Sequence, residues 1–413
     1  MLARVLIFAM FGLFTSALFA QENLDHWLEQ YKSPKSDDRI EAVLKVGEML
    51  ETLDEVDAEK AYEFMFQAFA DRTSLVQSAA KVRLAQRPDG AVPYLKKFID
   101  SEKERDFLMA CEAIKSIGPE AKIYLPGIVK RLDGKVEHLR LAALHAMRVM
   151  DGEDLLPYLD QVIAALDSEN FNVQLSACRV IIQIGEPAKK AGPRLVKLME
   201  EGIVSARSWA SIALGAIGPH EDYDVVDLLS QKLPEFYLVD RERALIGLAY
   251  LGPNAKKALP AVEKLMVDES KSVEHVAART RWKITGDADK SVEVLIKLLP
   301  TMEHGADSMD ILAEMEGAAK KAVPFLIEQT LSTEAASREG AVYALAAIGA
   351  ESESALPRLK KIASKDKDRM IREAAKLAME SIREAKDKAS QEARIKDEKP
   401  DASDSGEAKS SGG

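Results

Sequence analysis

The fold is decided by a segment that occurs three times with almost the same residues: Ala188-Lys-Lys-Ala-Gly-Pro193, Ala255-Lys-Lys-Ala-Leu-Pro260 and Ala319-Lys-Lys-Ala-Val-Pro324. The copies begin 67 and 64 residues apart, which is two periods of about 33 residues each. A period of this length is typical of a repeat protein in which each unit is one supersecondary element. Such a unit buries its apolar face only against its neighbours.

A helix is expected to end at the same place in every period. Glycine followed by proline, as in Ile217-Gly-Pro219, is the usual chemistry for ending a helix. We call the corresponding residues the stop positions, and they are Gly118, Asp151, Gly185, Gly218, Gly252, Thr285, Glu316 and Gly349.

Residues one, four and eight positions before each stop lie on one face of a helix. The column eight residues before is small: Ala110, Ala143, Ala177, Ala210, Ala244, Ala277, Ser308 and Ala341. The column four residues before is mostly large and apolar: Ile114, Met147, Ile181, Leu214, Leu248, Arg281, Leu312 and Leu345. A second helix per period begins near each proline, where its missing N–H is tolerated. The sequence therefore predicts an all-α fold, an α-solenoid of about eleven stacked helical hairpins spanning residues 21–383.

The repeat resembles the short HEAT repeats found in bacterial proteins. The segment Arg338-Glu-Gly-Ala-Val-Tyr-Ala-Leu-Ala-Ala-Ile-Gly349 carries the pattern, and the resemblance extends from about residue 30 to residue 383. The signatures of tetratricopeptide and ankyrin repeats are missing. The resemblance implies a superhelix in which the helix before each stop position lines the concave side, and HEAT proteins serve unrelated tasks.

The two ends of the chain differ from the repeats. One positive charge in 1–4, an apolar run in 5–19 and small residues at Ala17 and Ala20 predict a signal peptide over residues 1–20, cleaved near Ala20. This indicates an exported protein, periplasmic or extracellular and bacterial in style. An uncleaved segment would instead make the chain a membrane-tethered adaptor. Residues 384–413 lose the period and predict a charged, disordered tail.

Composition narrows the partners and the redox chemistry. The 57 basic and 68 acidic residues give a net charge of -11, which disfavours nucleic acid as a partner. Cys111 and Cys178 occupy equivalent positions two periods apart, roughly 20 Å if helices stack at about 10 Å. A disulfide needs Cα atoms within about 7 Å, so both cysteines are predicted to be core residues.

We find no catalytic signature in the chain. It has no Gly-rich phosphate loop, no Gly-x-Ser-x-Gly elbow, no Cys-x-x-Cys pair and no His-x-x-x-His metal pair. Deoxyhypusine hydroxylase resembles this architecture and binds iron through several His-Glu dipeptides. Only His220-Glu221 has that order here, and it is predicted to lie on a surface turn. The sequence thus predicts no enzyme activity, no cofactor and no metal.

The helix surface facing away from the core columns is the candidate binding face. Ten residues with aromatic or basic side chains fall on it: His145, Arg148, Arg179, Trp209, Arg243, Tyr250, Arg279, Trp282, Lys283 and Tyr343. Exposed aromatics and arginines anchor protein interfaces, and arginine pairs with carboxylate or phosphate. The pattern predicts an acidic protein partner or an anionic glycan.

Two alternatives to this interpretation stay open. In the first, the face is an ordinary helix surface of mixed charge, because it also carries the acidic residues Glu112, Asp310 and Glu314. If Gly286 replaces Thr285 as the stop position, Trp282 turns into the core and Arg281 turns outward.

The leading functional hypothesis is an exported, non-catalytic interaction scaffold whose protein partner lies along the concave face. The alternative is an enzyme or enzyme-associated subunit, lyase-like or metal-dependent, with a groove site formed by His145, Arg148 and Arg179.

Overall fold

The computed structural model describes residues 24–234, 237–301 and 305–397, and every regular element in these ranges is a helix. The chain forms two compact units, Met1–Tyr223 and Asp224–Gly413. Residues 1–23, with the predicted cleavage site near Ala20, and residues 398–413 of the predicted tail lie outside the described part.

The first unit contains six helical hairpins in its described residues. Each is given as first helix, then second helix: 24–30 with α2 (Ser36–Met49); α3 (Glu55–Gln67) with α4 (Ser74–Ala85); α5 and α6 (Pro88–Ala91, Lys96–Ile99) with α7 (Glu104–Ile117); α8 (Leu125–Val129) with α9 (Glu137–Met147); α10 and α11 (Gly152–Leu155, Leu159–Ala165) with α12 (Phe171–Ile184); α13 (Gly192–Glu201) with α14 (Val204–Ala216).

The second unit contains five hairpins in its described residues. They are α15 (Val225–Ser230) with α16 (Leu238–Leu251); α17 (Leu259–Leu265) with α18 (Lys271–Thr285); α19 (Asp289–Leu298) with α20 (Gly305–Glu314); α21 (Val323–Gln329) with α22 (Ala335–Ile348); α23 (Leu356–Lys365) with α24 (Arg369–Asp397). The prediction of an all-α solenoid of about eleven hairpins is confirmed. Because α24 extends to Asp397, the predicted tail begins as a continuation of the last helix.

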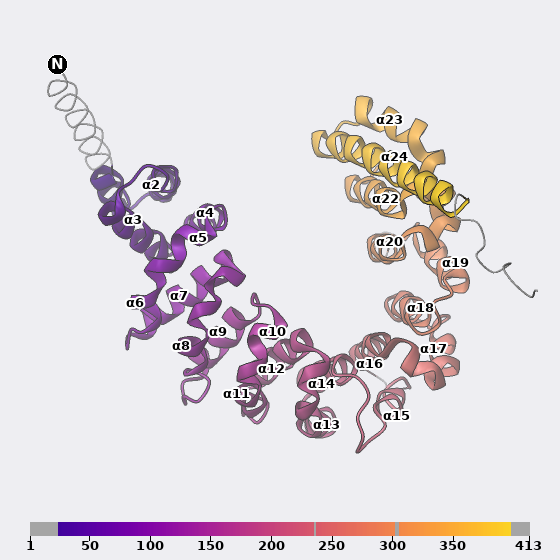
Figure 1. Ribbon diagram of the computed structural model, residues 1–413, viewed down its shortest axis with the longest axis horizontal. Coiled ribbons are helices and arrows are strands. Elements are labelled where there is room, and N and C mark those ends of the chain that lie inside the picture. The colour runs from indigo at the N-terminus through magenta and orange to yellow at the C-terminus, as the bar shows by residue number, and fades with distance from the viewer. Residues whose placement is uncertain (1–23, 235–236, 302–304, 398–413) are drawn as a thin grey trace, which may run out of the picture. The chain divides into compact units, whose positions relative to one another are not determined.

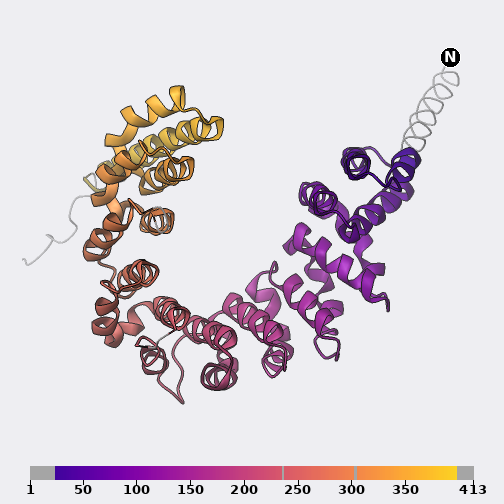
Figure 2. The ribbon, with the colours of Figure 1, turned by 180° about the vertical axis from the view of Figure 1, so that it is seen from behind.

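Within each unit the second helices pack on one another in sequence order, for example α7 on α9, α9 on α12 and α12 on α14, or α20 on α22 and α22 on α24. Figures 1 and 2 show that they lie on the inner side of each unit's row of hairpins. The surface of the second helices that faces away from the core columns is called the second-helix face below.

The first helices are shorter and interrupted. The repeated Ala-Lys-Lys-Ala segments form 3-10 turns, η5 (Glu186–Ala191), η6 (Gly252–Ala258) and η7 (Glu316–Ala322). Each 3-10 turn is followed by an α-helix with proline at its second residue, as at Pro193 in α13. Proline is tolerated there because the first N–H groups of a helix have no partner within it.

The predicted core columns are buried in the structure. All eight members of the small column are fully buried, at 0% exposure. The large column four residues before the stops is buried as well, and Arg281 is its one charged member. Small side chains let neighbouring second helices approach closely while the large columns fill the space between them.

Arg281 is buried, as the stop position Thr285 predicts, although the helix itself ends at Gly286. Its guanidinium is buried, with Nε donating to Glu263 Oε1 at 3.0 Å and Nη2 to Asp287 Oδ2 at 2.9 Å. Trp282 is half-buried. The alternative that placed Arg281 outside and Trp282 in the core is therefore wrong, because two carboxylates compensate the buried charge. Gly286 nevertheless ends α18 in the left-handed region, at φ 71°.

Cys111 and Cys178 are buried free thiols on α7 and α12. Burial raises the pKa of both thiols, that of Cys178 to about 12. The prediction that they are core residues is confirmed.

A buried arginine that the sequence analysis missed ties neighbouring hairpins together. In the second unit, Arg338 of α22 binds Asp366 through two bonds, Nε–Oδ2 at 2.8 Å and Nη2–Oδ1 at 3.0 Å. Its Nη1 also donates to the carbonyls of Ser332 and Thr333 in its own turn. Arg39 makes the same set of bonds with Asp71 in the first unit. Both ion pairs are buried, so each guanidinium fixes the turn before its helix to the turn of the next hairpin.

Six of the eight stop positions end their second helix through a residue with positive φ, and in the period of Thr285 the next residue, Gly286, takes this conformation. Five of the eight stop residues are glycines with positive φ, and Glu316 also adopts a positive φ of 49°. Asp151 differs: its φ is -72° and it precedes α10 in extended conformation. A left-handed conformation costs an L-residue roughly 1–2 kcal/mol, whereas glycine adopts it freely. Glu316 is thus the strained member of the series.

We expect Glu316→Gly to raise the free energy of unfolding by about 1 kcal/mol, because glycine removes the steric cost of the left-handed conformation. Urea denaturation followed by circular dichroism measures it. The matched control is Gly349→Ala, which places a Cβ at φ 70° and is expected to lower stability. A Glu316→Gly protein no more stable than wild type would contradict this account.

Candidate functional site

Four of the predicted binding residues lie on the second-helix face of the first unit. His145 is on α9, Arg148 directly follows α9, Arg179 is on α12 and Trp209 is on α14. Since α9, α12 and α14 pack in series, successive hairpins bring these side chains to one surface.

Arg179 and Trp209 form a cation–π pair. The guanidinium carbon lies 4.2 Å from the centre of the indole ring, and both side chains are half-buried. Such a pair is worth about 0.5–2 kcal/mol, depending on how far the cation is desolvated. The stacking holds a planar hydrogen-bond donor flat against an aromatic ring at the surface.

His145 is held neutral beside this pair. Burial lowers its pKa, and the positive charges of Lys115, Arg148 and Arg179 lower it further, against the opposing charge of Glu112. Its Nε2 lies 3.2 Å from the hydroxyl of Ser176, which is 1% exposed. A hydroxyl so deeply buried cannot reach a substrate, so the Ser176–His145 contact is packing rather than a nucleophile with its base.

Arg148 carries a positive charge that the described part of the chain does not compensate. It is exposed and makes no ion pair with a described residue. The neighbouring carboxylate on this face, Glu112, is engaged by Lys115 at 2.8 Å and Lys81 at 3.4 Å. The second-helix face of the first unit is therefore locally positive, although the whole chain is acidic.

The corresponding face of the second unit is largely neutralised. Arg279 of α18 binds Glu314 of α20 through Nε at 2.5 Å and Nη2 at 2.8 Å, and Lys283 binds the same carboxylate at 2.8 Å. The Arg279 hydrogen bonds lower the pKa of Glu314, against its burial, to about 2. Lys283 also lies 4.4 Å from the centre of the Trp282 ring. These cations are bound within the unit.

The remaining predicted residues are scattered over the second unit. Arg243 on α16 is half-buried, whereas Tyr250 at the end of α16 and Tyr343 on α22 are 54% and 63% exposed. The structure thus brings His145, Arg148, Arg179 and Trp209 together and gives Arg279, Trp282 and Lys283 a separate environment. The contact between Ser176 and His145 could not be predicted from the sequence, because the two residues lie on different hairpins.

The pKa of Glu314 generates a prediction about acid stability. The ion pairs stabilise the folded state fully above the ordinary glutamate pKa of 4.5, and this contribution is lost as the pH falls toward about 2. We expect Glu314→Gln to destabilise the protein by about 1 kcal/mol at pH 7, a figure reduced for solvent screening. Denaturant midpoints at several pH values measure the difference, which should shrink from pH 5 to pH 2.5. The control is Glu316→Gln, which has no ion pair in the described residues; a difference that is independent of pH would contradict the assignment.

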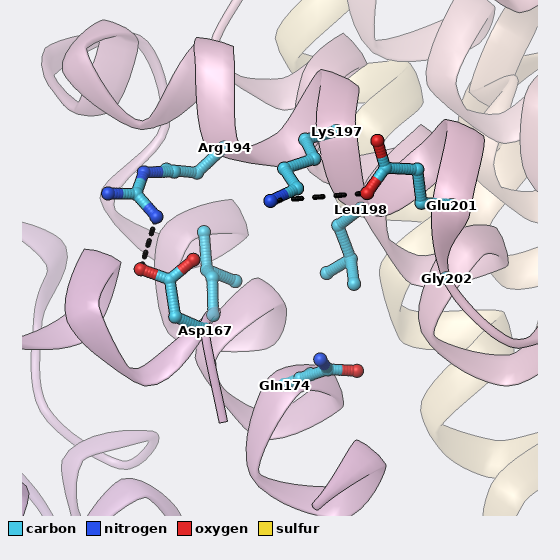
Figure 3. A pocket seen from close by; sticks show the side chains of 8 residues that line it. Asp167, Gln174, Arg194, Lys197, Leu198, Glu201 and Gly202 are labelled. Carbon is cyan, nitrogen blue, oxygen red and sulfur yellow. Dashed lines mark hydrogen bonds and ion pairs between the residues drawn. The ribbon is translucent and has the colours of Figure 1, made fainter. Parts of the chain in front are cut away.

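A separate hollow lies between the turn after α11 and the end of α13. Lys197 lies 4.0 Å from Glu201 of the same helix, and Figure 3 shows Arg194 paired with Asp167 beside them. The hollow has a volume of about 230 Å³. Its two cations and two carboxylates compensate one another. The hollow therefore offers no net charge to a ligand.

His220 lies in a packed turn rather than on an open surface. Its ring stacks on Tyr223 with centroids 4.3 Å apart, and its Nδ1 accepts from the Asp222 amide at 3.2 Å. The prediction of a plain surface position is corrected by this stacking, since the turn packs over Gly192, whose missing side chain leaves room for Tyr223. Within the described ranges, no group of three His, Cys, Asp or Glu residues could hold a metal ion. No helix in those ranges is both long enough and apolar enough to cross a membrane.

Comparisons with known proteins bear on the fold only. No protein-family model and no curated protein matches the chain. Among solved structures, an engineered protein is 19% identical at a TM-score of 0.42, over 87% of this chain and 98% of that one. The karyopherin Kap121p, also solved bound to Pho4p, is 13% identical at a TM-score of 0.42, over 91% of this chain and 47% of Kap121p. The chain spans about half the length of Kap121p, and the HEAT-like character rests on the packing described above.

Proposed function

We propose that the chain is an exported, non-catalytic α-solenoid scaffold that binds an acidic protein partner through the second-helix face of its first unit. The observation that carries the proposal is the Arg179–Trp209 pair beside the uncompensated charge of Arg148. Tryptophan and arginine are the residue types that most often dominate interface energies. The Arg179–Trp209 pair presents an oriented aromatic surface, and the guanidinium of Arg148 beside it makes no ion pair with a described residue, so it can pair with a carboxylate.

The charge pattern supports an acidic partner in particular. Lys115, Arg148 and Arg179 all lie close enough to His145 to lower its pKa, and Glu112 is the one carboxylate that opposes them. At physiological salt, charges beyond about 8 Å are screened, so the local positive surface acts on a partner more strongly than the net charge of -11. The enzyme alternative gains no such support, since Ser176 beside His145 is buried and no metal-binding group of three His, Cys, Asp or Glu residues occurs in the described ranges.

The proposal is tested by quantitative affinity capture from the native cell envelope, with the chain lacking residues 1–20 as bait. The amount of partner captured by Trp209→Ala/Arg148→Glu should be at least tenfold lower than by wild type. This variant removes the aromatic anchor and reverses the uncompensated charge. Lys96→Glu/Lys197→Glu, on exposed first-helix positions, is the control and should retain the partner.

Arg148→Glu alone provides a second variant that leaves the core untouched, and thermal unfolding verifies that all variants fold. Equal capture by wild type and Trp209→Ala/Arg148→Glu would show that the second-helix face is not the binding surface.

Export is proposed from the apolar run in 5–19 and the small residues at Ala17 and Ala20. Intact-mass measurement of protein recovered from the periplasm of a bacterial expression host is expected to show loss of residues 1–20. Signal peptidases need a small residue before the cut, so Ala17→Arg/Ala20→Arg should block processing. A recovered chain that keeps residues 1–20 would favour the tethered adaptor instead.

A further inference from the structure

Two open hollows meet at the turn edge of the first three hairpins, and the smaller one reaches the second-helix face at Glu112. The larger, about 610 Å³, is lined by the turns before α2 and α4 and includes Lys32, Arg72 and Arg105. The smaller, about 550 Å³, is lined by Phe69, Leu108 and Met109 and by two carboxylates, Glu104 and Glu112. Glu112 is paired with Lys115 and Lys81. Ala70 and Arg105 line both, so the two hollows form one continuous surface with a basic part and an apolar part. We call it the turn-edge hollow.

The carboxylate that lines the basic part is already occupied. Asp71 accepts from Arg39 at 2.8 and 3.0 Å and from the Thr73 amide at 2.8 Å. The Tyr31 hydroxyl binds it too, and burial together with this bond raises the pKa of Tyr31. The buried Arg39–Asp71 pair thus adds no net charge to the surface.

Two arginines remain with their charge available. Arg72 donates through Nη2 to the carbonyl of Pro34 at 2.8 Å, which fixes the side chain without neutralising it. Arg105, exposed at the start of α7, makes no ion pair with a described residue. Its neighbour Glu104 lies 2.9 Å from Nε2 of His138, a hydrogen bond that does not by itself remove the negative charge of Glu104. Arg72 and Arg105 outnumber this one carboxylate. Anionic groups are therefore favoured at this end of the hollow.

Three apolar side chains line the apolar part. Phe69 and Met109 are buried, at 7% and 5% exposure, and form its floor, while Leu108 is half-buried beside them. Leu108 lies three residues after Arg105 on α7, which places their Cβ atoms about 5–6 Å apart. Alternate residues of an extended peptide are about 6.8 Å apart on one side.

We propose that the turn-edge hollow binds an extended peptide segment in which an apolar residue stands within two positions of an acidic residue. The apolar side chain packs on Phe69, Leu108 and Met109, and the carboxylate lies between Arg72 and Arg105. The hollow is open and presents three apolar side chains, which suits one leucine or phenylalanine rather than a long acyl chain. This site borders the second-helix face at Glu112 and would give the scaffold a second point of attachment.

The test uses fluorescence anisotropy with the labelled, amidated peptide Gly-Leu-Gly-Glu-Gly at low salt. We expect saturable binding below 1 mM, weakened at least tenfold by Arg105→Glu and within twofold of wild type for the control Arg148→Glu. Both variants change the net charge equally at exposed arginines, so a difference between them reports the site. Replacing glutamate by glutamine in the peptide, or Leu108→Ser in the protein, should also weaken binding at least threefold.

The outcomes that would overturn the proposal are distinct. Absence of saturable binding at 1 mM, or equal weakening by Arg105→Glu and Arg148→Glu, removes the site or reduces it to general charge attraction. Displacement of the peptide by decanoate at a tenfold lower concentration than by unlabelled peptide would assign the hollow to a fatty acid. Thermal unfolding of Leu108→Ser separates loss of binding from loss of the fold.

Discussion

The structure depends on one packing constraint: no hairpin has a core of its own, and each buries its apolar stripe against the next. The fully buried column from Ala110 to Ala341 makes this contact possible, since one methyl group per period lets second helices approach to the 8–10 Å of close packing. Where serine replaces alanine at Ser308, the hydroxyl is buried without a hydrogen-bond partner in the described residues. Serine keeps the small volume of alanine but buries this hydroxyl. Side-chain size therefore governs which residues occupy this column.

A second constraint acts at the turns, because each hairpin must be held at a fixed angle to the next. Left-handed residues at the stop positions set the reversal after the second helix, and buried guanidinium groups such as Arg39 and Arg338 fix the turn before it. The two devices act at opposite ends of the same helix. Together they fix the angle between hairpins at the turns, so the second-helix face contributes to stability only through inter-repeat pairs such as Arg279 with Glu314.

The sequence predicted the columns and the stop positions because a helical period converts spacing directly into facing. It did not predict which surface charges are available, because their partners lie one repeat away, as for Arg279 and Glu314, 35 residues apart. Sequence spacing places Arg279 and Glu314 on the same face. It does not show that two hydrogen bonds join them and compensate their charges. Arg281 illustrates the same limit: it occupies a leucine position, and only Glu263 and Asp287 make its burial tolerable. Asp71, similarly, is paired before any ligand arrives.

These pairings separate cations that serve the fold from cations that are exposed to a partner. Arg39, Arg281 and Arg338 are buried with carboxylates, and Arg279 is largely neutralised by Glu314. Arg72, Arg105 and Arg148 are not paired with a described carboxylate, and all three belong to the first unit. At physiological salt, exposed charges more than about 8 Å away are largely screened. A partner therefore responds to the nearby charged groups and not to the net charge of the whole chain. Two positive surfaces on one unit, each beside aromatic or apolar side chains, can therefore engage two segments of one acidic partner, and the second attachment gains affinity from the effective concentration that the first creates.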